Sequence, residues 1–428
     1  MRISTSLLFN TGLTTINNQQ ADLMHVMQQM GENRRMTSPA DDPLAAAQSI
    51  NIAQSQALNQ RFADNRAVAM RDLGAEENTL ESLVLLMQDV QTRVVEAGNG
   101  TLSDADRATL SGVLASARET MLGLANATDG NGQYLFSGSQ GQTSPYQLVG
   151  GRYVYQGDTQ QRNIQADQTR QIAGGDVGSD IFNRAQPGTR GYTTSAGPNA
   201  TTPGPNLGTG VVSKASVTDS SLANINYAYK VEFTSETSYT VTVTDVSTDP
   251  ATPVSPADPL DPLDLPVSYT LAPGAKTLEL GYGMQVQFEG TPQIGDTFGV
   301  DPLVHTDVNV FDTLGDLITA LNSPSSVDAT GTAALRNVLN SSIQRLTTSY
   351  DNILTVRASV GARMNELESL DTNGTQRNLG YTTALEDLEG LDFYDATMKL
   401  NLRKMALEGA ALAFKTIQNM SLFNMGGR

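Results

Sequence analysis

Proline is concentrated in the middle of the chain, and this distribution decides where long helices can form. Of the 17 prolines, 13 lie between Pro187 and Pro302, and the flanks on either side contain few. Proline removes a helical hydrogen bond and clashes with the preceding turn. The two flanks are therefore expected to be helical, and the middle is not.

Both flanks carry the three-and-four spacing of apolar residues that long packed helices show. In the first flank this spacing starts with Leu13, Ile16, Gln20, Leu23, Met27 and Met30. It returns from Phe62 to Val94, after a break at Ser38, Pro39, Ala40, Asp41, Asp42 and Pro43. Asp42 can cap a helix whose first residue is Pro43, and Gly98 can end that helix.

The second flank repeats the pattern from Leu335 to Leu370 and closes with a broad apolar surface. One stripe of the last segment is formed by Met398, Leu402, Met405 and Leu412. A second stripe beside it contains Ala406, Ala410, Ala413, Ile417 and Met420. A helix that is apolar on so many sides needs more than one partner, which favours packing between subunits.

Shorter elements are predicted between the long helices. Ser103 and Asp106 form a capping-box-like pair before a third helix, whose apolar face includes Leu110, Val113 and Leu114. Two short alternating runs around Gly150 and Gly151 predict a hairpin. Residues 134–175 are expected to form one small antiparallel sheet.

Together these patterns predict an α+β multi-domain protein. Both termini would form a long antiparallel helical, coiled-coil rod, with a small β-hairpin region and an inserted all-β outer domain. The predicted terminal domain comprises residues 1–42 and 390–428, and the rod domain comprises residues 43–185 and 310–389. Residues 186–309, which are rich in Pro, Gly, Thr and Asp and contain alternating stretches, are the predicted outer β domain.

The composition disfavours most chemistry. The 428 residues include no cysteine and two histidines, His25 and His305, so thiolate, disulfide, zinc-finger and most triad chemistry is not expected. The net charge of −18 opposes nucleic acid as a partner. No apolar run is long enough to span a membrane, and the start of the chain lacks the pattern of a cleavable signal peptide. No enzyme activity, metal or cofactor is predicted.

Candidate acidic sites have simpler interpretations. Asp41 and Asp42 lie between two prolines and are expected to shape a break between domains rather than to bind metal or catalyse a reaction. Asp258, Asp261 and Asp264 lack the loop glycine and final glutamate of a calcium-binding hand and favour a solvated loop. His25 is expected to be an interface or surface residue.

Both flanks contain distinctive segments. In the first flank these include MRISTS at the start, the SPADDP break at 38–43, NGTLSDADR at 99–107 and NATDGNGQYLFSG at 126–138. On the far flank they are VRASVGARMNELE at 356–368 and LAFKTIQNMSLFNM at 412–425. These segments resemble the bacterial flagellin superfamily, and within it the chain looks most like the hook-associated proteins of the hook–filament junction.

This resemblance implies a structural adaptor of the bacterial flagellum that lies outside the cell. Such a protein is exported by the flagellar type III apparatus without a cleavable signal peptide. It polymerises through its terminal helices and joins the hook-associated ring to the flagellin filament. The implied partners are copies of itself, the hook-side hook-associated protein, flagellin and an export chaperone that binds the C-terminal helix; nucleic acid and membranes are not among them.

Two alternatives remain open at this point. The chain could be a flagellin filament subunit, or a secreted adhesin or glycan-binding protein acting through its middle β domain. The leading hypothesis assigns the assembly interface to Leu13, Ile16, Leu23, Met27, Met30, Met398, Leu402, Met405, Leu412, Ile417 and Met420. It assigns the inter-domain break to Ser38, Pro39, Asp41, Asp42 and Pro43.

Overall fold

The computed structural model describes residues 5–248, 251–254, 267–272, 274–323 and 328–425. The chain divides into two compact units. The first comprises Met1–Arg66, Ala166–Thr169 and Glu368–Arg428, and the second comprises Ala67–Gln165 and Arg170–Leu367. The three predicted domains differ from this division and remain a prediction.

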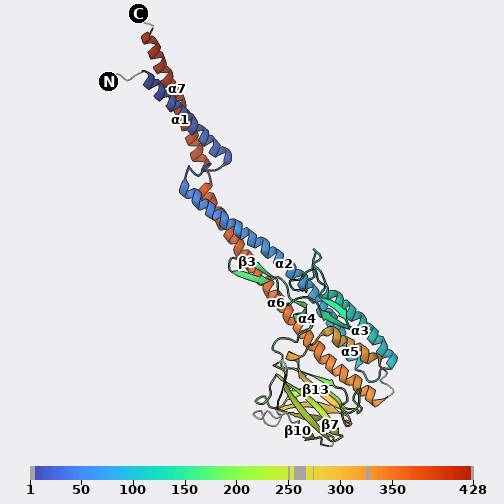
Figure 1. Ribbon diagram of the computed structural model, residues 1–428. Helices are drawn as coiled ribbons and strands as arrows, with labels where there is room; N and C mark the ends of the chain where they lie inside the picture. Colours follow the sequence, from blue (N-terminus) through green and yellow to red (C-terminus); the bar gives the residue numbers. More distant parts are fainter. Residues whose placement is uncertain (1–4, 249–250, 255–266, 273, 324–327, 426–428) are drawn as a thin grey trace. The chain divides into compact units, whose positions relative to one another are not determined.

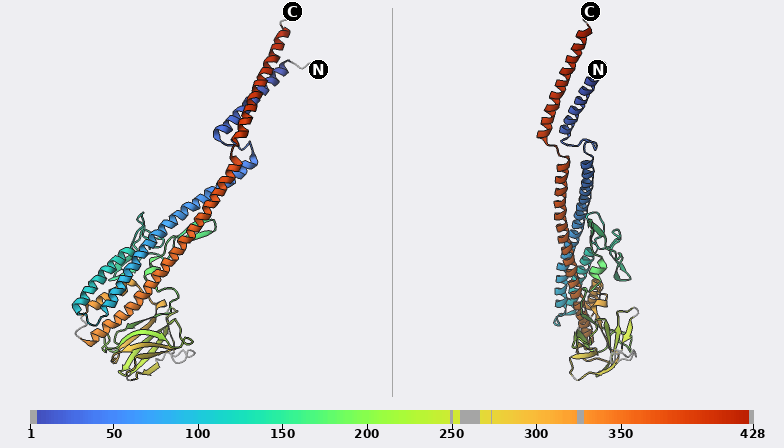
Figure 2. Two further views of the ribbon diagram at one scale, coloured as in Figure 1. Left: turned by 180° about the vertical axis from the view of Figure 1, so that it is seen from behind. Right: turned by 90° about the vertical axis from the view of Figure 1, so that its left-hand side faces the viewer.

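The first unit is built from four helical segments. Helix α1 (Thr5–Glu32) lies along α7 (Phe393–Met425), as both views in Figure 2 show. The other two segments are the start of α2 (Pro43–Ala97) and the end of α6 (Ala329–Glu389). As predicted, α2 begins at Pro43, and Asp42 Oδ1 accepts a hydrogen bond from the Ala45 N–H at 3.1 Å.

The predicted heptad positions of the two long helices are buried within the second unit. On α2 these include Leu73, Leu80 and Met87, and on α6 they include Leu346 and Ile353. The Gln88 side chain donates to the Tyr350 hydroxyl at 2.8 Å. The Arg357 Nε donates to Glu77 Oε1 at 2.6 Å, so the two segments run in opposite directions.

Two shorter helices of the second unit pack against each other. Helix α3 (Asp104–Ala125) begins with the predicted capping box, in which Ser103 and Asp106 exchange hydrogen bonds. Helix α5 (Val310–Asn322) was not predicted. Its cap, Asn309, accepts hydrogen bonds from the Phe311 and Asp312 N–H groups. The prediction was wrong for Val113, which is 41% exposed on α3.

Residues 134–175 form two separate hairpins instead of the one predicted sheet. The first pairs β1 (Tyr146–Val149) with β2 (Arg152–Tyr155) through Gly150 and Gly151, whose φ angles are 61° and 87°. These positive values explain why two glycines form this turn. The second hairpin pairs β3 (Asn163–Asp167) with β4 (Arg170–Ala173), and the short helix α4 (Gly178–Phe182) follows. In each hairpin the two strands pair only with each other, and among the described residues no third strand joins either hairpin.

The middle of the chain forms two antiparallel sheets, drawn in yellow-green in Figure 1. The larger sheet has the order β10-β8-β7-β13-β5, with β9 also paired to β8, and the smaller has the order β11-β12-β6. Their buried faces share one core, which includes Val231, Val241, Val286, Phe288 and Phe298. The strands are β5 (Tyr192–Ala196), β6 (Val211–Val217), β7 (Tyr227–Ser235), β8 (Ser238–Asp245), β9 (Thr252–Val254), β10 (Val267–Thr270), β11 (Thr277–Gly281), β12 (Met284–Glu289) and β13 (Thr297–Pro302). A 3-10 turn, η1 (Leu303–His305), follows.

The mixed helix-and-sheet class is therefore confirmed. Asp258, Asp261 and Asp264, which the sequence places in a solvated loop, lie outside the described residues.

An aromatic cluster should hold α5 against the hairpin β1–β2 and helix α4. The Phe311 ring lies 4.9 Å from Tyr146, 5.6 Å from Tyr153 and 5.6 Å from Phe182, and its side chain is buried. We expect Phe311→Ala to lower the free energy of unfolding by about 3–5 kcal/mol, because it leaves a cavity in a closed cluster. Urea denaturation would measure this. Val113→Ala, at an exposed position, should change the free energy of unfolding by less than about 0.5 kcal/mol. Equal effects of the two substitutions would contradict the role given to the Phe311 cluster.

Candidate assembly surface

The terminal helices α1 and α7 pack along one seam. Buried and partly buried residues of α7 recur at intervals of four and three: Ala396, Leu400, Arg403, Leu407, Ala410 and Phe414. The Phe9 and Phe414 rings lie 5.0 Å apart, and Arg403 Nη1 forms an ion pair with Asp22 Oδ2 at 2.9 Å. Gly12 allows the close approach, because a Cβ there would lie 2.7 Å from the Phe414 ring.

The α1 side of this seam follows only part of the apolar repeat of the sequence. Ile16, Leu23 and Met30 are partly buried, whereas Gly12, Gln19 and Val26 are less exposed than their neighbours Leu13, Gln20 and Met27. The Phe414 ring needs the space that Gly12 leaves. The assignment of Leu13, Ile16, Leu23, Met27 and Met30 to an interface between copies remains a prediction.

The remaining predicted residues whose side chains are described are exposed apolar residues. Met398, Leu402, Met405 and Leu412 are between 55% and 69% exposed on α7, and Leu13 and Met27 are 45% and 57% exposed on α1. These six side chains lie outside the α1–α7 seam. Ile417 and Met420 belong to α7, but their side chains lie outside the described part of the chain.

The segment between α1 and α2 and the segment between α6 and α7 are joined to each other by backbone contacts. Arg34 and Gly390 form an isolated antiparallel bridge, and the Arg35 N–H donates to the Glu389 carbonyl at 2.7 Å. The Arg35 guanidinium also donates to the Leu388 carbonyl at 2.9 Å. The break between α1 and α2 is thus held beside the break between α6 and α7.

Asp41 and Asp42 shape the first of these breaks. The Asp41 carboxylate accepts hydrogen bonds from the Thr37 and Ser38 N–H groups, both at 2.9 Å, and lies 3.1 Å from His25 Nε2. The hydrogen bond from Ser38, followed by the contacts with Thr37 and His25, lowers the pKa of Asp41 to about 2. Helix α1 and the start of α2 both belong to the first unit, so the role of Ser38, Pro39, Asp41, Asp42 and Pro43 as a boundary between domains remains a prediction.

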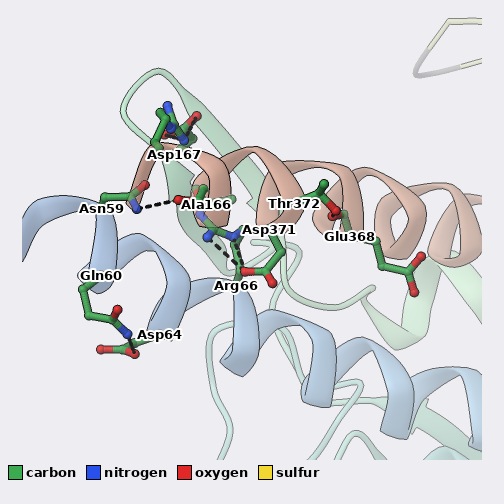
Figure 3. Close-up of polar contacts among 11 residues, drawn as sticks. Asn59, Gln60, Asp64, Arg66, Ala166, Asp167, Glu368, Asp371 and Thr372 are labelled. Carbon is green, nitrogen blue, oxygen red and sulfur yellow. Dashed lines mark hydrogen bonds and ion pairs between the residues drawn. The ribbon is translucent and has the colours of Figure 1, made fainter. Parts of the chain in front are cut away.

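A buried arginine joins three segments of the first unit, as Figure 3 shows. The Arg66 side chain of α2 is 2% exposed and donates to Asp371 Oδ1 of α6 from Nε at 3.1 Å and from Nη2 at 3.0 Å. Its Nη1 donates to the Ala166 carbonyl at the tip of the hairpin β3–β4, at 3.1 Å. Gly374 leaves room for the guanidinium, because a Cβ there would lie 2.4 Å from Nη2. In the sequence, Arg66 is a polar residue within an apolar repeat. This exception to the repeat is the signal from which a buried polar contact could have been expected.

We expect Arg66→Met to lower the free energy of unfolding by about 1–3 kcal/mol, because the Ala166 carbonyl loses its buried donor. The matched control is Arg377→Met. Arg377 also contacts the hairpin tip, through Asp167 at 3.0 Å, but its side chain is 40% exposed. The control should cost less than about 1 kcal/mol in the same denaturation experiment. A larger loss from the control would contradict the importance given to Arg66.

A second polar heptad residue, Glu76, is buried in the second unit. Its Oε1 accepts a hydrogen bond from the Asp176 N–H at 3.2 Å, and the Asp176 carboxylate forms an ion pair with Arg363. Glu76 Oε2 is buried and has no hydrogen-bond partner among the described residues. Burial, reinforced by the Asp176 carboxylate and opposed by Arg363, raises the pKa of Glu76 to about 8. Glu76 therefore keeps its proton to a higher pH than an exposed glutamate does.

A small cavity lies beside Glu76. It is lined by Asp72, Asp129 and Arg162 as well as Glu76, and its volume is about 50 Å³, which suits water molecules. In the described part of the chain, no group of three or more His, Asp or Glu side chains is placed to hold a metal ion.

The raised pKa of Glu76 should make stability depend on pH. Between about 4.5 and 8 the folded protein holds a proton that the unfolded chain has released, so this contribution to stability is full below pH 4.5 and is lost as pH rises through 8. We expect Glu76→Gln to reduce the fall in unfolding free energy between pH 6 and pH 8.5. Urea titrations across this range would measure the slope, and an unchanged slope in the variant would contradict a protonated Glu76.

Comparisons with known proteins agree with a class of flagellin-like assembly proteins. Residues 3–141 match the family described as the bacterial flagellin N-terminal helical region. The described part of the chain has no helix of the length and apolar character that a membrane crossing requires.

More particular similarity extends over the whole chain. It is 27% identical over 425 residues to the flagellar hook-associated protein 3 of Escherichia coli strain K12, covering 99% of both chains. Its structure resembles that of Xanthomonas campestris FlgL, with a TM-score of 0.65 and 27% identity, covering 78% of this chain and 99% of that one. It also resembles the flagellar junction protein FlgL from Legionella pneumophila, with a TM-score of 0.61 and 28% identity, covering 80% of this chain and 100% of that one. The resemblance to the hook-associated proteins of the flagellin superfamily is thereby confirmed.

Proposed function

We propose that this protein is a structural component of the bacterial flagellum that joins the hook-associated ring to the flagellin filament. It polymerises through its terminal helices. The observation that supports this most directly is the set of exposed apolar residues on α1 and α7, in a chain similar along 99% of its length to flagellar hook-associated protein 3.

The physical driving force is the burial of these residues. Full burial of one large apolar side chain contributes about 1.5–3 kcal/mol. Met398, Leu402, Met405 and Leu412 follow one side of α7 at intervals of four, three and seven, which suits packing against a helix of a neighbouring copy. The α1–α7 pair therefore buries one seam and leaves this stripe of α7 exposed. A subunit of a helical assembly requires such an exposed stripe to contact its neighbours.

We propose that the interface comprises the residues that the sequence indicated, with different roles. Leu13, Met27, Met398, Leu402, Met405 and Leu412 would contact neighbouring copies directly. Ile16, Leu23 and Met30 would act by holding α1 against α7. Ile417 and Met420 would extend the first set toward the C-terminus.

We further propose that α2 and α6 together form the antiparallel rod of the molecule and that residues 186–309 are an inserted outer domain. This rests on the opposite chain directions of α2 and α6 in each unit. In the first unit, Asn59 Nδ2 donates to the Gly374 carbonyl at 2.8 Å and Gln56 Nε2 donates to Asn378 Oδ1 at 3.0 Å. It also rests on the separate core of the two sheets.

The proposed partners are copies of this chain, the hook-side hook-associated protein, flagellin and an export chaperone for α7. The proposed location is the flagellum, outside the cell, after export without a cleavable signal peptide. The proposed role is mechanical and involves no catalysis.

The alternatives receive less support. A flagellin filament subunit shares the N-terminal helical region, but the similarity to hook-associated protein 3 extends over both flanks and the middle. An adhesin acting through the β domain would not account for the exposed apolar residues on the terminal helices.

We expect Leu402→Asp to abolish incorporation at the junction. A carboxylate buried without a partner at a helix interface costs several kcal/mol, whereas on the exposed face of the monomer it costs little. Cells that lack the native protein and produce the variant should carry few filaments. The unfolding free energy of the purified monomer should change by less than about 0.5 kcal/mol.

The matched control is Val95→Asp, which places the same charge at a 66% exposed valine of α2, in the second unit. This variant should be secreted and should support normal filaments. Normal filament numbers with Leu402→Asp, or equal losses with both variants, would contradict the proposed surface.

A further inference from the structure

Strand β6 lies at the edge of the smaller sheet, within the second unit. It pairs with β12 on one side, and among the described residues no strand pairs with its other side. An edge strand presents a row of backbone N–H and carbonyl groups to which a strand of another chain can bind. In the proposed function this edge matters, because assembly brings copies of the two sheets close together.

Helix α6 covers this edge with amide side chains. The Val212 N–H donates to Asn337 Oδ1 at 2.9 Å, and the Val212 carbonyl accepts a hydrogen bond from Asn340 Nδ2 at 2.9 Å. Asn337 Nδ2 donates to the Gly210 carbonyl at 3.0 Å, and the Asn337 side chain is buried. A side-chain amide offers the same donor and acceptor groups as a peptide. The two asparagines therefore take the place of a neighbouring strand.

A third amide joins this edge to the edge of the larger sheet. Strand β5 pairs with β13, and no other described strand pairs with it. Gln344 Oε1 accepts a hydrogen bond from the Thr194 N–H of β5 at 3.0 Å, and Gln344 Nε2 donates to the Ser213 carbonyl of β6. Asn337, Asn340 and Gln344 are separated by three and four residues, so they lie on one face of α6. That face hydrogen-bonds the outer strands of both sheets.

Two further features of β6 disfavour pairing with another chain. Val286 of β12 lies opposite Ala215, and Phe288 lies opposite Val212, so β6 has two residues where β12 has one. This extra residue forms a bulge, and Lys214 within the bulge is exposed. Bulges, lysines and covering helices are the means by which edge strands avoid pairing with other chains. All three occur at β6.

We propose that α6 protects the β6 edge, because Asn337, Asn340 and Gln344 occupy the backbone groups through which β6 of a second copy would otherwise pair. The two β6 strands would pair antiparallel about a twofold axis, since a contact between like edges is self-complementary. The inference rests on the proposed function only in so far as assembly brings copies together. It identifies a surface that stays closed during assembly, in addition to the surface that assembles.

Removal of the amides should open the edge. In the full-length chain we would combine Asn337→Leu with Gln344→Met, which remove the amides and keep similar side-chain sizes. Every variant would also carry Leu402→Asp, which is expected to prevent association through the terminal helices, and Leu402→Asp alone is the parent. At low protein concentration we expect amide hydrogens in residues 193–196 and 210–214 to exchange at least tenfold faster than in the parent, measured by mass spectrometry.

At high protein concentration the same double variant should form dimers in light scattering, and the parent should not. Exchange in residues 210–214 should then become slow again, because pairing between copies protects the β6 backbone. If the double variant does not fold, Gln344→Met alone carries the test, with weaker dimerisation expected because Asn337 and Asn340 still cover β6.

The matched control is Asn352→Leu in the same background. Asn352 is a buried amide of the same helix, and its Nδ2 donates to the Asp180 and Ile181 carbonyls at 2.8 Å and 3.1 Å, outside the two sheets. This variant also loses buried hydrogen bonds, so it should be less stable than the parent. It should remain as monomeric as the parent, because the β6 edge stays covered.

Three outcomes would overturn the proposal. The first is a folded variant without the amides that associates no more than the parent at high concentration. The second is equal dimerisation of Asn352→Leu, which would attribute association to a general loss of stability. The third is dimers in which residues 210–214 still exchange rapidly, which would place the contact elsewhere. Self-association of the parent would count against the proposed terminal-helix surface alone, because protection of the edge is judged by the difference from the parent.

Discussion

The approach of Phe414 to Gly12 determines how the terminal helices present their apolar residues. This contact turns one stripe of each helix inward and leaves Met398, Leu402, Met405 and Leu412 exposed on α7. A pair of helices can bury one seam, and both of these helices have apolar residues on more than one side. The exposed apolar residues need partners that cover them, and the proposed polymerisation would supply those partners.

The long helices depend on a similar balance between apolar repeats and a few buried polar groups. Arg66 and Glu76 interrupt the heptads of α2, and each binds to a segment outside the helices. Arg66 holds the hairpin tip at Ala166, and Glu76 accepts a hydrogen bond from Asp176 after β4. An apolar residue at either position would pack against α6 but would leave these backbone groups without a partner. The polar positions therefore specify where the hairpin segment attaches.

Features governed by local rules could be predicted from the sequence. The caps at Asp42 and Ser103, the glycine turn at Gly150 and the three-and-four repeats all act over a few residues, and the structure contains each of them. The repeat of α1 alone does not show that Gly12 rather than Leu13 faces α7, because that choice depends on the shape of Phe414 on a distant helix. The buried contacts of Arg66 with Ala166 and of Glu76 with Asp176 join residues 100 positions apart, so the repeat marks the two polar positions but does not identify their partners. Helix α5 was missed although Asn309 is a suitable cap.

The central claim is that the exposed stripe of α7 becomes buried between copies, and the absence of cysteine from the chain allows a direct measurement. Single cysteines would replace Leu402 on the exposed stripe, Leu407 on the α1–α7 seam and Ile294 in the β domain. Maleimide labelling rates would be compared between the purified monomer and flagella isolated from cells. The account predicts that Leu402→Cys reacts rapidly in the monomer and at least tenfold more slowly in the flagellum. Leu407→Cys should react slowly in both, and Ile294→Cys rapidly in both. Equal labelling of Leu402→Cys in the monomer and in the flagellum would contradict the account.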